Sequence, residues 1–254
     1  MANTVFRFLE EPVDVWSSIH DKNGKNILEK YYADQTKYAF SFQMMAYISR
    51  LSLLRKAIKN TSSKFKKNPV IFSIEGNIGT GKSTLMQHLQ KHFAGASEAG
   101  ASEAGAGASE AGAGASEAGA GASEADIIVT ERSLYTDYHV FAQMLYDTNK
   151  IEDVEFAIYR KWFDEFIEDL PAFAFIYIRC EPQVSFARVN KRARNGESVI
   201  PLSYLENCHL YHEQWLMSSN KKNRILVIDA NSDINGDGAL LSKWIKQIEE
   251  FILF

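Results

Sequence analysis

Short apolar runs alternate with longer stretches of helical periodicity along most of the chain. The runs that read as strands are 5–9, 70–74, 127–129, 172–178 and 225–228. Helical periodicity marks about 24–60, 83–93, several stretches that end near 170, and about 240–253. Short apolar strands that alternate with helices are typical of a parallel sheet buried on both faces. The pattern therefore predicts an α/β fold that forms a single domain over 1–254.

The periodic pattern breaks off at 94–125, a tract made only of Ala, Gly, Ser and Glu. Its units repeat Gly-Ala-Ser-Glu-Ala with small variations, and none contains a residue that could form a core. Such a segment cannot offset the entropy lost on ordering, and its frequent Gly residues disfavour a lasting helix. We predict a flexible linker with an r.m.s. span of roughly 30 Å. Its regular repeat suggests an engineered segment.

The formal net charge of −4 does not describe the folded part of the chain. Five glutamates belong to the 94–125 tract, so the other residues carry a net charge of +1. This near neutrality argues against a nucleic-acid polymer or a membrane as the main partner. No apolar run reaches the roughly 18 residues of a membrane-spanning helix, and we expect no signal or transit peptide. With only two cysteines, Cys180 and Cys208, a reduced cytoplasmic protein is the simplest expectation.

The strongest chemical signal is the segment Gly-Asn-Ile-Gly-Thr-Gly-Lys-Ser at 76–83, which fits the phosphate-loop pattern G-x-x-x-x-G-K-S. A predicted strand precedes it and an amphipathic helix follows, so a chance match of a Gly-rich turn is the weaker interpretation. Lys82 is expected to contact the β- and γ-phosphates and Ser83 to bind Mg²⁺, with ATP or another NTP as phosphoryl donor. The predicted phosphate-binding residues are Gly76, Asn77, Ile78, Gly79, Thr80, Gly81, Lys82, Ser83 and Thr84. A guanine-reading Asn-Lys-x-Asp motif is absent from the sequence, which favours a transferase with its own acceptor site.

Charged residues near other predicted elements suggest where the acceptor binds. Glu11 follows a strand, and Pro12 restricts it to an extended conformation, so its carboxylate could accept a proton from a hydroxyl group. Glu131 and Arg132 follow another strand, where Glu131 is a candidate Mg²⁺ ligand. A helix end carries arginines that could close over the phosphates, although a solvated basic helix end is the plain alternative. These arginines are Arg188, Arg192 and Arg194.

Taken together, these motifs resemble the eukaryotic and viral deoxynucleoside kinase family. The resemblance rests on Glu-Pro-Val with Trp16, Phe-Gln at 42–43, Glu-Arg-Ser at 131–133, the Arg-rich segment and Ile-Pro-Leu-x-Tyr-Leu at 200–205. It covers nearly everything outside 94–125. It implies a P-loop kinase fold whose five parallel strands have the spatial order 2-3-1-4-5 in the family's own numbering. It also implies transfer of the γ-phosphoryl group of an NTP to the 5′-hydroxyl of a deoxynucleoside.

The resemblance also implies roles for single residues. Glu11 matches the general base, and Arg132 the arginine that helps to hold the 5′-hydroxyl. Tyr32 and Glu197 match the pair that binds the 3′-hydroxyl, and the arginines of the basic helix end match those of the family's lid. The base is expected to contact Gln43 and to stack on Phe141. The other pocket residues implied are Val13, Trp16, Leu28, Tyr31 and Phe42, with Tyr31 larger than the expected Met or Leu.

Helix spacing adds a hypothesis about which base is bound. Gln43, Ala46 and Arg50 share one helix face, and a buried Arg50 needs a counter-charge. Asp137 occupies the family position that supplies it. This set resembles deoxycytidine and deoxyguanosine kinases, so dC, dA or dG is expected to be preferred over dT. A broad-specificity or thymidine-type kinase is the alternative within the family.

The order of the segments differs from that of the family, which places the phosphate loop first. Here segment 4–63 precedes the phosphate-loop unit 68–93, and the linker 94–125 leads into 126–254. Two blocks are therefore exchanged, giving a non-native connectivity, and both new joints are expected to run along the sheet edge opposite the active site. The family forms homodimers, and the amphipathic stretch near 152–170 could supply the interface. A nucleoside monophosphate kinase, or a nucleotide-binding scaffold without turnover, remains open.

Overall fold

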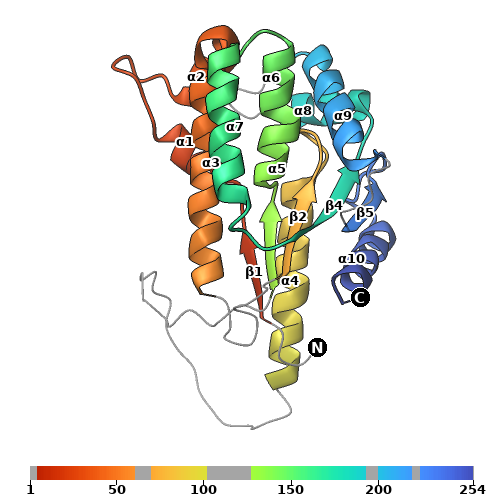
Figure 1. Cartoon of the computed structure of the whole chain (residues 1–254). Coiled ribbons are helices and arrows are strands. Elements are labelled where there is room, and N and C mark those ends of the chain that lie inside the picture. The colour runs from red at the N-terminus through yellow and green to blue at the C-terminus, as the bar shows by residue number, and fades with distance from the viewer. Residues whose placement is uncertain (1–4, 61–69, 102–126, 193–199, 219–223, 254) are drawn as a thin grey trace.

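The described part of the chain forms one five-stranded parallel sheet with helices on both faces (Figure 1). This computed structural model describes residues 5–60, 70–101, 127–192, 200–218 and 224–253. The strands are β1 (Phe6–Leu9), β2 (Val70–Glu75), β3 (Ile127–Glu131), β4 (Phe173–Arg179) and β5 (Arg224–Asp229). They lie in the order β1-β3-β2-β4-β5, and each neighbouring pair is parallel.

The predicted α/β class and strand order are both confirmed. In the family's numbering the phosphate-loop strand counts first and the strand before Glu-Pro-Val second, so the predicted order 2-3-1-4-5 is the order observed. All five predicted strands are present, with ends that differ by up to two residues. β3, for example, continues to Glu131 because it pairs with β2 as far as Ile74.

The helices agree with the predicted ones in position but differ at several ends. Asp34 divides the predicted helix 24–60 in two, and Asn26 begins the first part with a capping box that includes Glu29. The helices are α1 (Val13–Ser17), α2 (Ile27–Ala33), α3 (Gln35–Lys59), α4 (Lys82–Ala101), α5 (Leu134–Thr136), the π-helical turn η1 (Asp137–Ala142), α6 (Gln143–Asp147), α7 (Asp153–Ile167), α8 (Pro182–Arg192), α9 (Leu202–Leu216) and α10 (Gly238–Leu253).

Helix α4 ends at Ala101 rather than at residue 93, so its last eight residues belong to the tract predicted as a linker. Alanine and glutamate are good helix formers, and a helix that has already started propagates at little cost. Residues 102–125 of that tract lie outside the described residues, as does the whole joint at 61–69. The flexible linker therefore stays a prediction.

Alternate residues of the strands face two different helical layers. Ile71, Ile128 and Phe175 point to the side covered by α3 and α9. Phe72 and Val129, each one residue further on, point to the side covered by α4 and α10. Both faces of the sheet are therefore buried, as in parallel sheets generally.

The carboxyl ends of the strands meet at the edge where α5 begins, and Figure 1 shows all the strand arrows pointing there. Ligands of open parallel sheets bind at this edge. The described end of α3 and the described start of β2, which flank the joint at 61–69, lie toward the opposite edge (Figure 1). Within the described ranges, no helix combines the length and the apolar character that a membrane span requires.

Candidate active site

The phosphate loop joins β2 to α4 in a conformation that requires glycine. Gly76 and Gly79 have φ values of 142° and 83°, outside the range that other residues adopt easily. A Cβ atom at Gly76 would lie 2.6 Å from the carbonyl oxygen of Ile178, and one at Gly79 would lie 2.6 Å from that of Ser185. The loop therefore packs against β4 and α8 with no room for side chains. Its backbone and the start of α4 form a site suited to phosphate groups.

Lys82 lies buried at the first position of α4. Its Nζ atom donates a 2.7 Å hydrogen bond to the carbonyl oxygen of Asn77 within the loop. Burial lowers the pKa of Lys82 to about 7, and the positive charge of Arg132 acts in the same direction. Negative phosphate oxygens are the natural partners of a cation in such a place.

Ser83 and Glu131, the two predicted Mg²⁺ ligands, lie side by side. Ser83 Oγ donates a 2.9 Å hydrogen bond to Glu131 Oε1. Groups of three or more His, Cys, Asp or Glu side chains that could hold a metal ion do not occur in the described ranges. One hydroxyl and one carboxylate nevertheless fit Mg²⁺, which binds few protein oxygens and keeps waters and substrate phosphates as its other ligands.

Glu11 lies two residues after the end of β1, between two arginines from other parts of the chain. Its Oε1 atom accepts hydrogen bonds from Arg50 Nη2 at 2.5 Å and from Arg132 Nη1 at 2.7 Å. Although burial favours the neutral acid, the charges of Arg132, Arg50 and Lys82 lower the pKa of Glu11 to about 2. Glu11 is therefore a carboxylate at neutral pH.

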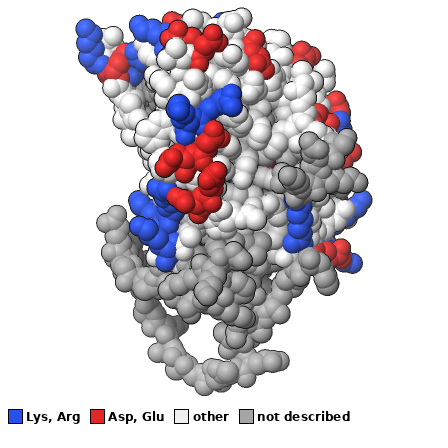
Figure 2. Space-filling view, viewed as in Figure 1, with Lys and Arg blue, Asp and Glu red and all other residues white. Residues whose placement is uncertain are grey.

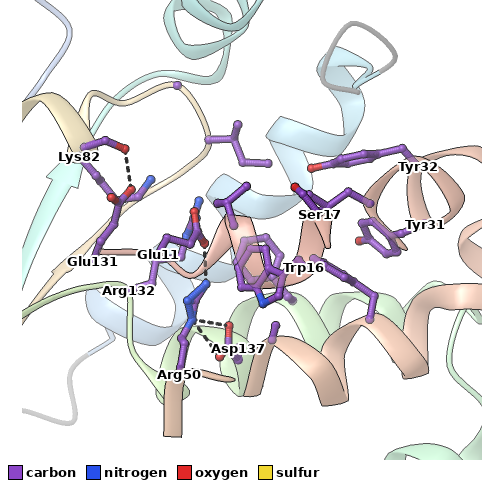
Figure 3. Close-up of a pocket in the computed structure, with 18 of the residues that line it drawn as sticks. Glu11, Trp16, Ser17, Tyr31, Tyr32, Arg50, Lys82, Glu131, Arg132 and Asp137 are labelled. Carbon is purple, nitrogen blue, oxygen red and sulfur yellow. Dashed lines mark hydrogen bonds and ion pairs between the residues drawn. The ribbon is translucent and has the colours of Figure 1, made fainter. Parts of the chain in front are cut away.

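Arg50 joins Glu11 to Asp137, as Figure 3 shows. Arg50 Nε lies 3.2 Å from Asp137 Oδ2, so the predicted pair is in contact. Burial raises the pKa of Asp137 to about 6, against the opposing charge of Arg50. The contact between Arg50 and Glu11 was not predicted, because helix spacing reveals only which residues share a face.

A cavity of about 450 Å³ connects the phosphate loop with an aromatic pocket. This size is typical of small-molecule sites. Every predicted nucleoside-binding residue in the described ranges lines it: Val13, Trp16, Leu28, Tyr31, Tyr32, Phe42, Gln43, Ala46, Arg50, Asp137 and Phe141. Six of the phosphate-loop residues, together with Glu11, Glu131 and Arg132, line the same cavity. The structure thus brings the two halves of the predicted site together.

Both aromatic rings and unpaired polar atoms belong to residues that line the cavity. Phe42 stacks on Tyr31 with ring centroids 4.6 Å apart and meets Trp16 edge-on at 5.4 Å. Gln43 Oε1 and Arg50 Nη1 are buried and have no hydrogen-bond partner among the described residues. Buried polar groups are normally paired, so these atoms are suited to the polar edge of a planar ligand.

The predicted lid arginines are placed differently from one another. Arg192 lines the cavity, whereas Arg188 does not. Arg188 instead donates hydrogen bonds to the carbonyl oxygens of Ala230 at 2.8 Å and Asn231 at 3.3 Å, after the end of β5. Carbonyl groups beyond a strand end need donors, and Arg188 supplies them. Arg194, like the nucleoside-binding Glu197, lies outside the described residues.

Sequence reasoning missed several residues of the cavity. Ser17, Asn26 and Glu29 line it near α1 and α2, and no pattern in the sequence marks them. Tyr204 belongs to a quoted motif but was not assigned a role, and its hydroxyl lies 2.9 Å from that of Tyr31. This pair joins α2 to α9.

The phosphate loop lies between a parallel strand and a helix, and it faces a cavity that holds a buried carboxylate and two arginines. Together these features define a P-loop kinase fold with a site for a small acceptor. The sequence profile described as "Deoxynucleoside kinase" matches residues 1–73 and 116–253. The chain therefore belongs to the deoxynucleoside kinase family, and it is an enzyme of that family.

Individual relatives agree with this assignment. The chain is 30% identical to deoxycytidine kinase 2 of Gallus gallus over 96% of its own length and 79% of the relative's. It is 32% identical to deoxycytidine kinase of Mus musculus over 99% of its own length and 82% of the relative's. It is 34% identical to mitochondrial thymidine kinase 2 of Homo sapiens, over 40% of each chain.

Proposed function

We propose that this chain transfers the γ-phosphoryl group of ATP, or of another NTP, to the 5′-hydroxyl of dC, dA or dG in preference to dT. The observation that carries the proposal is the position of Glu11. Its carboxylate is held by Arg50 and Arg132 in one cavity with the phosphate loop and the aromatic pocket. A hydroxyl group beside Glu11 would face a bound triphosphate.

In the proposed reaction, Glu11 accepts the proton of the 5′-hydroxyl as the oxygen bonds to the γ-phosphorus. The bond from that phosphorus to the β,γ-bridging oxygen breaks, and the nucleoside diphosphate leaves. Lys82 and Arg132 stabilise the negative charge on the transferring group. Ser83 and Glu131 would hold Mg²⁺, which neutralises phosphate charge when it is bound.

A coupled assay of nucleoside diphosphate release, run with each of the four deoxynucleosides, tests this function. We expect turnover with at least one of dC, dA and dG, and a lower kcat/KM for thymidine. A thymidine kcat/KM equal to the best of the others would overturn the preference. Nucleotide binding without turnover would overturn the reaction.

The double substitution Arg50→Met with Asp137→Ala is expected to shift preference toward thymidine. It removes the charged pair from the pocket wall and leaves apolar space for the 5-methyl group. The ratio of thymidine to deoxycytidine kcat/KM should rise about tenfold or more, the range expected for pocket contacts. Arg55→Met is the matched control, since Arg55 lies on the same helix but is 44% exposed. An unchanged ratio in the double variant would refute this account of selectivity.

Arg50→Met alone is expected to change the pH profile. Loss of one positive charge beside Glu11 favours its protonated form, so the pKa of Glu11 rises from about 2. The acid limb of kcat/KM should therefore move to higher pH than in the wild type, and a shift to lower pH would contradict the contact.

We also propose that the enzyme is a homodimer that pairs through α7. Val154, Ile158 and Trp162 lie four residues apart on α7 and are 66%, 41% and 43% exposed. Ile48 of α3 is 46% exposed as well. Such a stripe is unusual on a free helix surface. Figure 2 shows acidic and basic side chains on this same side of the molecule, and a two-fold axis could bring groups of opposite charge together.

Trp162→Glu should convert the dimer into a monomer, because it places a charge in the apolar stripe. Sedimentation velocity measures the change directly. Met217→Glu is the control, since Met217 is 50% exposed at the C-cap of α9, away from that stripe. A wild-type monomer, or equal dissociation in both variants, would contradict the assignment.

We also propose that segment 4–63 and the phosphate-loop unit 68–93 are exchanged relative to their order in the family. The family profile matches ranges on either side of 74–115 and leaves out the phosphate loop between them. This is expected of a loop that the family places before segment 4–63. The strands still reach the family's spatial order because β2 lies between β3 and β4. An experimental structure with β2 at a sheet edge would contradict this interpretation. A reduced cytoplasmic setting stays a prediction, and both cysteines are buried thiols.

A further inference from the structure

Glu75, the last residue of β2, is a fully buried carboxylate that the proposed chemistry does not use. Its exposed fraction is 0%. Ser73 Oγ and Ser133 Oγ donate to its Oε1 atom at 2.7 Å and 2.6 Å, and Thr136 Oγ1 donates to its Oε2 atom. Its hydrogen-bond donors in the described part of the chain are these three hydroxyl groups. Burying a carboxyl group is costly unless its oxygens are hydrogen-bonded, and here both oxygens of Glu75 accept hydrogen bonds.

Two of the three hydroxyl groups belong to the turn that follows β3. Ser133 is the N-cap of α5 and accepts a hydrogen bond from the backbone N–H of Thr136. Glu75 thus binds the N-cap residue and the third residue of the same helix. It fixes the point at which β3 ends and the helical run of α5 and η1 begins.

That turn carries residues of the acceptor site on both sides of these contacts. Arg132 immediately precedes Ser133 and has a φ of 61°, a conformation that non-glycine residues adopt at a cost. Its backbone N–H donates to the carbonyl oxygen of Ile74, next to Glu75. Asp137 immediately follows Thr136. The guanidinium of Arg132 and the carboxylate of Asp137 therefore both depend on where this turn is held.

Electrostatics favours the same arrangement. Although burial opposes the charged form, the carboxylates of Glu11, Glu131 and Glu75 raise the pKa of Arg132. The Glu75 carboxylate is thus one of three that favour the charged form of Arg132.

We propose that Glu75 is a positioning residue that couples the phosphate-loop strand to the acceptor site through Ser133 and Thr136. It holds Arg132 against Glu11 and Asp137 against Arg50. The coupling crosses from the segment that binds the phosphoryl donor to the segment that binds its acceptor. This inference rests on the proposed function for the identity of the ligands.

The sharpest test compares Ser133→Ala with Ser73→Ala. Each removes one hydroxyl donor from the same oxygen of Glu75, but Ser73 lies on β2 itself and is not attached to the turn. Ser133→Ala should lower kcat about tenfold, the value of one lost buried hydrogen bond. The KM for the NTP should stay within about threefold, since the phosphate loop is untouched. Ser73→Ala should leave both values within about twofold.

Glu75→Gln is the stronger variant. It keeps the size of the side chain but loses the charge and cannot accept all three hydroxyl protons. We expect kcat to fall about 100-fold, as for a displacement of roughly 1 Å, with the KM for the NTP again nearly unchanged. If this variant does not fold, the comparison of Ser133→Ala with Ser73→Ala tests the positioning role of Glu75 without it.

Binding of the deoxynucleoside, measured by calorimetry, separates this inference from the proposed function. Ser133→Ala should weaken binding and Ser73→Ala should not, whether or not turnover occurs. Equal effects of the two serine variants on kcat and on binding would overturn the positioning role. A wild-type enzyme that turns over no deoxynucleoside would instead refute the proposed function. The binding comparison of the two serine variants would still test the positioning role of Glu75.

Discussion

Glu11→Gln is expected to lower kcat about 10³-fold, the range of a lost general base. The amide keeps the shape of the side chain but cannot take a proton from the attacking hydroxyl. It also leaves Arg50 and Arg132 without the carboxylate oxygen that both contact. A steady-state coupled assay gives kcat, and thermal unfolding shows whether the variant is folded.

Glu10→Gln is the matched control for this change. Glu10 is the preceding residue, is exposed, and accepts a hydrogen bond from Gln90 Nε2 at 3.3 Å. Its kcat should stay within about twofold of the wild type. The affinity of Glu11→Gln for ATP should also be close to normal, because Glu11 does not belong to the phosphate loop. A Glu11→Gln enzyme that keeps a tenth of its kcat would rule out the role of base.

Lys82→Met is expected to lower kcat by about 10²–10³-fold, as for the loss of one donor to a transition-state oxyanion. Lys82 is 4% exposed and lies in the loop with its Nζ on the Asn77 carbonyl. A bound triphosphate would offer it a stronger, charged acceptor. Methionine fills the same volume and brings no charge.

Isothermal calorimetry should show weaker ATP binding in this variant, unlike in Glu11→Gln. Lys91→Met is the control, since Lys91 is exposed on the same helix. The two active-site variants should therefore differ. Glu11→Gln should lose turnover and keep its affinity for ATP, whereas Lys82→Met should lose both. Normal donor affinity in Lys82→Met would contradict the assigned phosphate contact.

The sequence predicted those parts of the molecule that depend on local pattern. Each strand is a short apolar run, and the phosphate loop depends on Gly76 and Gly79, whose backbone leaves no choice of residue. Motifs near strand ends were expected to meet because parallel strands end at one edge, and Glu11 and Glu131 do lie around one cavity.

Features that depend on tertiary contacts could not be predicted from the sequence. Spacing placed Arg50 on the same helix face as Gln43, but it could not show the contact with Glu11, which comes from another part of the chain. Arg188 lies on the same helix as Arg192, yet its guanidinium donates to carbonyl groups that follow β5. Glu75 was given no role from the sequence, and only the folded chain shows that hydroxyl groups from 58 and 61 positions away donate to it.

The most direct test of the account is the identity of the product. ³¹P NMR of a reaction with ATP, Mg²⁺ and each deoxynucleoside shows which oxygen has received the phosphoryl group. The account predicts a 5′-monophosphate from dC, dA or dG, formed faster than from thymidine and absent with Glu11→Gln on the same time scale. Turnover only when a nucleoside monophosphate is supplied, with a diphosphate as product, would contradict it.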